Sequence, residues 1–469
     1  MKIKIAYILL IIFVSVMCGC QSTPSKEIIV NGGNGELEET IMSETVESKQ
    51  YLLTDTIEDS SEATGKIEKA EIQTEHWEDT YALQKLKCEI NAEIMVPENG
   101  ICPVFKVKKR DFNEDIVKKI VEYFTIGATG VRETSPTKEE LEQKLIQTKR
   151  GYYVLDDNGG RWETYEDIEQ RIEELEDQIK SAKPEVFSPV TDSSYAFPIN
   201  NTFAMPNKKR VYVRATQQRI DVFPEKAGCV QPESWIIDGD AFPGEPVGTT
   251  LKNVKINKDE ACNLVNSFLT QLNIQGLGIS KMEKARIIID YTYETVSEGW
   301  KITLSRNDGN SIPVYINSSE VYGLLTYQPE NYVERWRQEK MVLYVDETGV
   351  KSIEWKNPIE VVEQLNENVP VKDFEEIKKM ILKYIKFAFT YNYGDSDITE
   401  QQIKLTKVIL TNVLIPMKDQ PEYHMLVPAW IVYYEQEDGL GVYTSILAVN
   451  AIDGSSIDLN FDGPDADSH

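Results

Sequence analysis

The stretch of sequence that decides the fold is DFEEIKKMILKYI, residues 373–385. Its apolar residues recur every three or four positions, which is the spacing of one helical face, and Asp373 with Glu376 forms a capping-box pattern. Three strand-like runs follow, at 403–415, 426–434 and 444–452. An antiparallel sheet can bury one apolar face under a helix while its other face meets water. The stretch therefore predicts a helix laid on an antiparallel sheet.

The same order of elements occurs earlier in the second half of the chain. Asn257 and Glu260 form a capping-box pattern ahead of an apolar helical stripe. Strand-like runs follow at 286–294, 300–305, 341–346 and 350–355. We therefore expect the fold class to be α+β, with two helix-on-antiparallel-sheet units after an N-terminal α+β domain.

The first half of the chain supplies that N-terminal domain. Runs at 86–95 and 104–107 flank a Pro-Glu-Asn-Gly turn and predict a hairpin, and a helical stripe follows at 111–124. Thr137 and Thr164 each open a further predicted helix. The divisions that we expect are a signal peptide at 1–19, a flexible tether at 20–75, the N-terminal domain at 76–246, one helix-plus-sheet unit at 247–358 and a second unit with an acidic tail at 359–469.

The start of the chain has the pattern of an exported lipoprotein. Two lysines precede an uncharged apolar run at 5–17, which is shorter than the roughly 20 residues that span a membrane. Gly19 places a small residue directly before Cys20, whereas the larger Met17 makes Cys18 a poorer candidate. We expect cleavage before Cys20, lipid on Cys20 and localisation on the outer face of the cytoplasmic membrane. An ordinary secretory signal is the alternative.

Four cysteines remain after export, Cys88, Cys102, Cys229 and Cys262. None lies in a CxxC pair, and the three histidines share no metal-ligand spacing with them. A disulfide between Cys88 and Cys102 would join two neighbouring strands, and reduced, buried thiols are the alternative that we favour. No metal site or other cofactor is expected.

Composition and motifs limit the possible functions. Asp and Glu number 77 against 50 Lys and Arg, so the surface repels phosphate backbones and nucleic-acid binding is not expected. The chain lacks GxSxG, GxxxxGK[ST], GxGxxG and HExxH, which are the motifs with the clearest catalytic mechanics. Carboxylate pairs of the glycosidase type stay open, but so many acidic residues make chance proximity uninformative. We expect no enzyme activity.

Two groups of side chains suggest ligands, each beside a simpler interpretation. The first group could offer oxygens to calcium but also fits a solvated turn and a frayed tail: Asp395, Asp397, Glu400, Asp462, Asp465 and Asp467. The second group could form a carbohydrate or peptide platform but also fits half-buried sheet residues: Tyr391, Tyr393, Tyr433, Tyr434 and Tyr443. In both cases we favour the simpler interpretation.

Two short motifs carry a resemblance to known proteins. LVPAW at 426–430 and LAVNAIDG at 447–454 resemble the closing strands of PepSY-like units, which occur in extracytoplasmic lipoproteins and in Yyc-type accessory proteins that restrain a sensor histidine kinase. The first unit, with LYVDETG at 343–349, departs by one residue and lacks the Pro-Ala-Trp. The whole chain resembles a clostridial-type extracytoplasmic lipoprotein family, a domain of unknown function. The resemblance implies two PepSY-like units and no catalytic residues.

These observations favour a non-enzymatic lipoprotein that binds a protein or peptide at the cell envelope. Its expected partners are the cytoplasmic membrane, through the lipid on Cys20, and an envelope protein or peptide that contacts exposed sheet edges. The alternative is a substrate-capturing lipoprotein for sugars or peptides, and a carboxylate-based hydrolase comes third.

Overall fold

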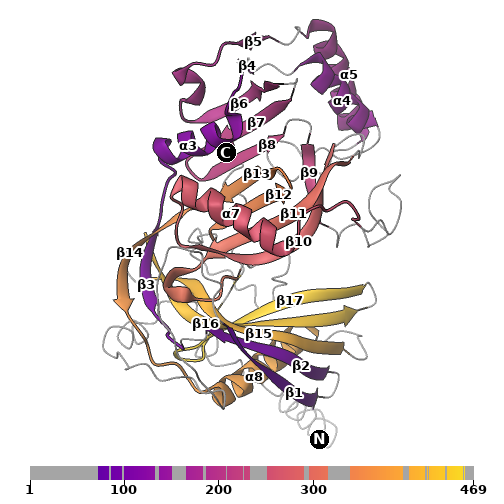
Figure 1. The fold of residues 1–469 in the computed structure, drawn as a ribbon. Coiled ribbons are helices and arrows are strands. Elements are labelled where there is room, and N and C mark those ends of the chain that lie inside the picture. Colours follow the sequence, from indigo (N-terminus) through magenta and orange to yellow (C-terminus); the bar gives the residue numbers. More distant parts are fainter. Residues whose placement is uncertain are drawn as a thin grey trace, which may run out of the picture.

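The molecule consists mostly of β-strands, arranged in two large sheets (Figure 1). The computed structural model describes residues 72–83, 86–97, 100–132, 137–149, 165–182, 186–206, 209–224, 227–232, 251–289, 295–314, 338–393, 401–417, 420, 422–438, 441–457 and 459. Within these residues there are five α-helices, and none is long and apolar enough to cross a membrane.

Sheet A, the lower sheet in Figure 1, joins strands from both ends of the chain. Its main path is β1 (Ile72–Leu83), β2 (Leu86–Pro97), β15 (Gln401–Pro416), β16 (Tyr423–Asp438), β17 (Gly441–Asn450) and β18 (Ser456–Ile457). β2 and β15 are parallel, whereas the other pairs on this path are antiparallel. A branch runs from β16 to β3 (Val104–Lys109) and on to β14 (Ile359–Asn366).

Sheet B contains ten strands within the described residues, and every pair in it is antiparallel. In spatial order these are β5 (Phe187–Ser188), β4 (Gly130–Arg132), β6 (Ile199–Ala204), β7 (Arg210–Ala215), β8 (Arg219–Pro224), β13 (Gly349–Lys356), β12 (Lys340–Asp346), β11 (Thr295–Arg306), β10 (Leu277–Ile289) and β9 (Ala227–Pro232). The centre of the sheet therefore pairs β8 from the first half of the chain with β13 from the second.

Helices α3 (Glu114–Thr125) and α7 (Lys258–Leu272) cover one face of sheet B, and α4 (Lys138–Lys149) pairs with α5 (Tyr165–Ser181) (Figure 1). The capping box predicted at the start of α7 is confirmed. Asn257 Oδ1 accepts from the Glu260 amide at 2.9 Å, and Glu260 Oε2 accepts from the Asn257 amide at 2.8 Å. The helix buries Ala261, Val265, Phe268, Leu269 and Leu272.

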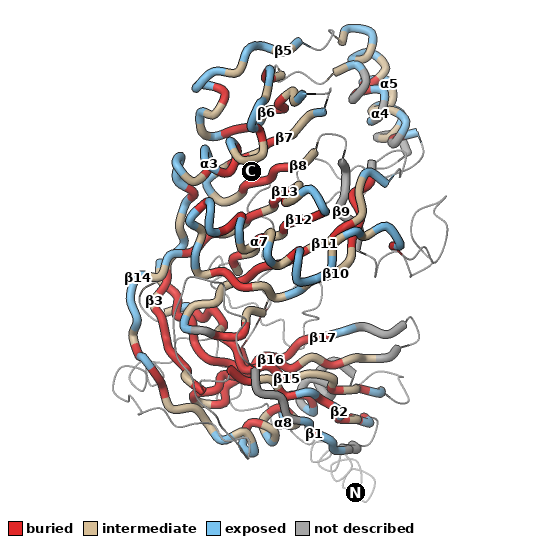
Figure 2. The backbone as a smooth tube through the Cα atoms, viewed as in Figure 1, coloured by how far each residue is buried: buried red, intermediate tan, exposed pale blue. Residues whose placement is uncertain are grey.

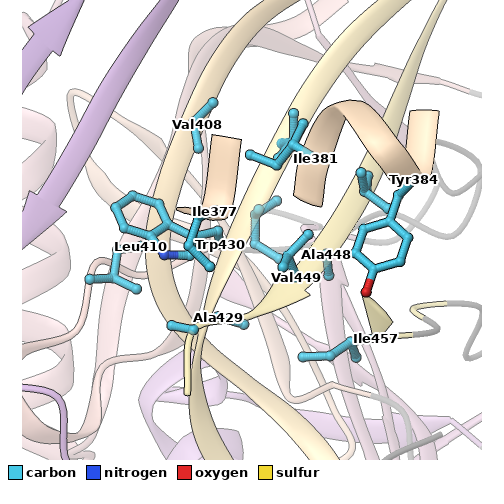
Figure 3. Close-up of a cluster of buried hydrophobic side chains, with 14 of the residues drawn as sticks. Ile377, Ile381, Tyr384, Val408, Leu410, Ala429, Trp430, Ala448, Val449 and Ile457 are labelled. Atoms are coloured by element: carbon cyan, nitrogen blue, oxygen red, sulfur yellow. The ribbon is translucent and has the colours of Figure 1, made fainter. Parts of the chain in front are cut away.

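Helix α8 (Phe374–Tyr393) covers one face of sheet A. Asp373 caps it through the Glu375 amide, at 2.8 Å from Oδ1. Figure 3 shows its residues Ile377, Ile381 and Tyr384 among the strand residues Val408, Leu410, Trp430 and Val449. The Tyr384 hydroxyl donates to the Gly454 carbonyl at 2.8 Å. Gly454 has φ +78°, and a Cβ there would overlap Met380 Sδ. Both the backbone conformation and the packing therefore favour glycine at the end of the LAVNAIDG motif.

The α+β prediction is wrong, because the chain is mostly β and its strands do not form separate helix-on-sheet units. In sheet A, β15, which follows α8, pairs with β2 from the start of the chain. In sheet B, β13, which follows α7, pairs with β8 from the first half of the chain. The predicted hairpin at 86–95 and 104–107 is also wrong, since β2 pairs with β1 and β15 while β3 pairs with β14 and β16. Local periodicity reports which face of a strand is buried, and it does not choose the partner strand.

The two sheets meet around a buried acidic residue, Glu339, which is 1% exposed. Its carboxylate accepts from Arg306 Nη1 at 3.1 Å, from Trp355 Nε1 at 2.9 Å and from the Ile359 amide at 3.4 Å. Arg306 in turn makes a bidentate pair with Asp308, at 2.7 Å and 2.5 Å. Burial raises the pKa of Glu339, and Arg306 opposes that rise. One side chain thus connects β11, β13 and the start of β14.

Backbone hydrogen bonds join the chain segments that pass between the two sheets near Glu339. The Arg110 amide donates to Pro358 O at 3.0 Å, and the Asn357 amide donates to Gln218 O at 2.9 Å. The loop after β11 reaches sheet A, where Thr411 Oγ1 donates to Ile312 O at 2.5 Å. Figure 2 shows buried residues along β3, whereas the outer strand β14 is mostly exposed between its buried end residues Ile359 and Asn366. The junction is therefore part of the folded core.

Replacement of Glu339 tests that role. We expect Glu339→Ala to lower the free energy of unfolding by about 3 kcal/mol or more, because breaking a buried pair takes the Glu339 acceptor from Arg306 Nη1 and from the Trp355 N–H. Urea unfolding of the full chain measures the change. The control is Glu360→Ala, which removes an exposed ion pair with Lys108 at 3.3 Å and should cost less than about 1 kcal/mol. Equal losses in the two variants would contradict a structural role for Glu339.

Candidate binding face

One face of sheet B is polar, because residues alternate between the two sides of a strand. Val213, Ile220 and Ile353 belong to the apolar core that contains residues of α3 and α7. Their neighbours Arg214 and Glu354, and Asp221 beside Ile220, therefore point to the opposite side of the sheet. That side carries charged and polar residues where the helix-covered side carries apolar ones.

Strand register aligns four of these polar residues directly across the sheet. Asn200 of β6 is paired with Arg214 of β7, Arg214 with Asp221 of β8, and Asp221 with Glu354 of β13. Residues paired in this way lie on the same face of a sheet, with Cβ atoms about 5 Å apart. We call Asn200, Arg214, Asp221 and Glu354 the polar row. It continues through Val342 of β12 to Thr303 of β11.

Basic side chains next to the polar row connect its carboxylates. Arg219 Nε lies 2.5 Å from Asp221 Oδ2, and Arg219 Nη2 lies 4.0 Å from Glu354 Oε2. Lys356 Nζ lies 3.4 Å from Glu354 Oε1. At the other end, the Tyr212 hydroxyl donates to Asn200 Oδ1 at 3.1 Å. These contacts hold the charged groups of β8 and β13 in fixed positions relative to one another.

Asp221 is the most unusual member of the polar row, since a charged residue is rarely buried. It is 3% exposed, and burial raises the pKa of its carboxyl group, with Arg219 opposing the rise. Its Oδ1 atom has no hydrogen-bond partner within the described residues, and the same holds for Thr202 Oγ1 on β6, on the far side of β7 from β8. A buried acceptor without a donor costs about 1–3 kcal/mol of stability. Two such acceptors on one face mark it as a candidate functional site.

The charge of this part of the face is positive. Among the described residues of β7, β8 and β13 on this face, Arg214, Arg219 and Lys356 outnumber Asp221 and Glu354. The whole chain carries a formal net charge of −27. The charge of this face is therefore opposite in sign to the net charge of the molecule. It favours a partner with negative groups over a partner with a positive surface.

Several residues that the sequence singled out lie outside the described residues. These are Cys20 with the predicted signal peptide and most of the tether, and the acidic residues Asp395, Asp397, Glu400, Asp462, Asp465 and Asp467. The lipid site and the calcium alternatives accordingly stay predictions. Within the described part of the chain, no group of three His, Cys, Asp or Glu residues is arranged to hold a metal ion.

The cysteines of the described strands and helices are thiols. Cys88 and Cys102 are buried, Cys262 is half-buried with its Sγ 3.4 Å from Met282 Sδ, and none of the three is in a disulfide. Burial raises the pKa of both Cys88 and Cys102 to about 12, so neither is a reactive thiolate at neutral pH. The alternative of a Cys88–Cys102 disulfide is not realised. The side chain of Cys229, in β9, lies outside the described part.

The histidines and tyrosines do not form a site within the described residues. His76 is exposed and lies 3.1 Å from Glu78, whereas His424 is buried, which lowers its pKa to about 4. Tyr434 is fully buried and offers no ring face for a sugar, whereas Tyr433 is half-buried, with Lys407 Nζ 5.8 Å from the centre of its ring. The side chains of Tyr391, Tyr393 and Tyr443 lie outside the described part.

The polar row was not identified from the sequence, although a signal was present. Strand-like runs at 211–213 and 221–223 are recognisable, and Arg210, Arg214, Arg219 and Asp221 alternate with their apolar residues. That alternation shows that the two strands have one polar face. It does not show that Glu354, more than 100 positions later, completes the row.

Comparisons with known proteins give only weak likenesses. No protein-family model matches the chain, and no curated protein matches it. An uncharacterised protein from Eubacterium rectale aligns with 81% of this chain and 92% of its own, at 14% identity and a TM-score of 0.41. The Bacillus megaterium YpeB C-terminal domain, which is PepSY-related, aligns with 74% of this chain and 96% of its own, at 11% identity and a TM-score of 0.27. The expected PepSY-like character thus has a weak structural neighbour, and no functional argument rests on it.

The burial of Asp221 generates a prediction about stability. The pKa of Asp221 is higher in the folded protein than its ordinary value of 3.8, so the ionised carboxylate disfavours folding above the folded-state pKa, and this cost vanishes below the ordinary value. We expect Asp221→Asn to raise the free energy of unfolding at pH 7 and to lose this advantage as the pH falls towards 4. Urea titrations of both proteins at each pH measure the difference.

The control for this experiment is Asp177→Asn, at a side chain that is 78% exposed, where we expect little change at any pH. A loss of stability in Asp221→Asn of more than about 1 kcal/mol at pH 7 would show that the ionised carboxylate stabilises the fold through Arg219.

Proposed function

We propose that this chain is a non-enzymatic binding protein that is tethered by lipid on Cys20 to the outer face of the cytoplasmic membrane. Its partner is a protein or peptide of the cell envelope. The contact surface is the polar face of sheet B around the polar row. The observation that carries the proposal is a set of ion-paired, partly buried charges on one sheet face, whose other face is closed by α3 and α7.

The polar face is a better contact surface than the β14 edge of sheet A. Edge strand β14 has two register shifts, between Val361 and Glu363 and between Gln364 and Asn366, which interrupt its ladder. Its exposed side chains include Glu360 and Glu363. Bulges and charges on an edge strand are the features by which proteins prevent the addition of another strand. Strand addition, which the sequence suggested, is therefore disfavoured at β14.

The lipid anchor is tested by Cys20→Ala in the full chain, expressed in its native cells. Removal of the proposed lipid acceptor should move the mature protein from the membrane fraction to the medium, because the acyl chains are the proposed attachment to the bilayer. Immunoblots of the two fractions measure the distribution. Cys18→Ala serves as the control and should leave the protein in the membrane fraction. Retention of the Cys20→Ala protein in the membrane would contradict lipid attachment at this position.

The binding role is tested by photo-crosslinking in living cells. A photo-reactive amino acid replaces Lys356, whose side chain is 30% exposed on the polar face, or Lys119, which is exposed on α3 on the helix-covered side of the same sheet. We expect mass spectrometry to find one envelope protein attached through position 356 and absent at position 119. The same set of abundant proteins at both positions would overturn the proposal.

A further inference from the structure

We propose that the polar face of sheet B recognises an acidic segment of its partner protein, and that the guanidinium of Arg214 binds a carboxylate of that segment. The inference rests on the proposed function and names the chemistry of the partner. Its first support is electrostatic, since a positive area on a chain of net charge −27 is an exception to the rest of the composition.

Arg214 is the basic group that the fold leaves available. It is half-buried in the middle of the polar row, and its side chain makes no ion pair or hydrogen bond within the described residues. The carboxylate directly across from it, Asp221, is bound by Arg219 instead. A guanidinium presents five N–H donors in a planar fork that matches a carboxylate with two parallel hydrogen bonds. Arg214 thus has the right group, on a strand whose register is fixed on both sides, and lacks an acceptor within the described residues.

The neighbouring charges are positioned rather than neutralised. Glu354 lies between Lys356 and Arg219, and Asp221 holds Arg219 from the other side. Side chains held in this way lose little conformational entropy when a partner binds. Asp221 Oδ1 and Thr202 Oγ1 are buried beside Arg214, and neither has a donor within the described residues.

The size of the positive area favours a short acidic segment over an extended polyanion. Adjacent strands lie about 4.8 Å apart, so the three strands from β7 to β13 span roughly 10 Å. That distance is close to the screening length at physiological salt. A short segment therefore responds to the local positive charge, whereas a nucleic acid or an anionic membrane also meets the acidic remainder of the surface.

The test uses the mature chain with Cys20→Ala and a fluorescent peptide of alternating Glu and Ser, compared with a peptide in which Gln replaces each Glu. We expect binding of the Glu peptide alone, with an affinity that falls as salt rises. Arg214→Gln should weaken binding about tenfold, and Arg214→Lys should give a smaller loss, because an ammonium keeps the charge without the planar fork. Fluorescence anisotropy measures the dissociation constants, and thermal melting checks that each variant is folded.

The matched control is Lys119→Gln, which removes one positive charge on the other side of the same sheet and should change the affinity less than about twofold. Equal binding of the Glu and Gln peptides, or equal losses in Arg214→Gln and Lys119→Gln, would overturn the inference. Competition by inorganic phosphate at concentrations that match the peptide would show a simple anion site instead.

If a partner crosslinks at position 356 while the Glu peptide fails to bind, the proposed function stands and the inference of an acidic partner segment is wrong. If both experiments fail, the proposed function falls as well.

Discussion

The buried carboxylate of Glu339 is the interaction on which the arrangement of the two sheets depends. It lies where β11, β13 and β14 come together, and it accepts hydrogen bonds from one residue or backbone group of each. A charge of this kind is tolerated in the interior only when its acceptor capacity is filled by donors in fixed positions. The pair with Arg306, itself held by Asp308, meets that condition. The orientation of the segment that leads into β14 follows from it.

The same physical condition separates the junction from the polar face. At the junction, Glu339 has three donors, and its role is to hold chain segments together. On the polar face, Asp221 is comparably buried, yet one of its oxygen atoms has no donor within the described residues. A filled network stabilises a fold, whereas an unfilled one reduces stability and is retained at sites that a ligand completes. This contrast is the reason for placing the candidate site on the polar face and not at the more highly charged junction.

The two faces of sheet B make two different kinds of interaction, apolar packing on one side and charged contacts on the other. The side under α3 and α7 is apolar and closed, and ring contacts such as the one between Tyr123 and Phe268, with centroids 4.9 Å apart, hold the helices together there. The other side has rigid backbone with charged side chains at spacings set by the strands. An antiparallel sheet allows this division because only one of its faces needs an apolar cover. The helices therefore fix the sheet that positions the charges.

The sequence by itself determined the local elements and several of their ends. The capping box of Asn257 and Glu260, the apolar stripe of α8 and the final strands with their LVPAW and LAVNAIDG motifs were all readable, because helix and strand periodicities depend on neighbours within a few positions. The reduced state of Cys88 and Cys102 was favoured correctly. Only the tertiary structure decided that β2 joins β15 and that β8 joins β13, which turned the expected α+β units into two large sheets. It also brought Glu354 beside Asp221. Strand partners are chosen by the summed packing of residues far apart in the chain, and no local pattern in this sequence contains that information.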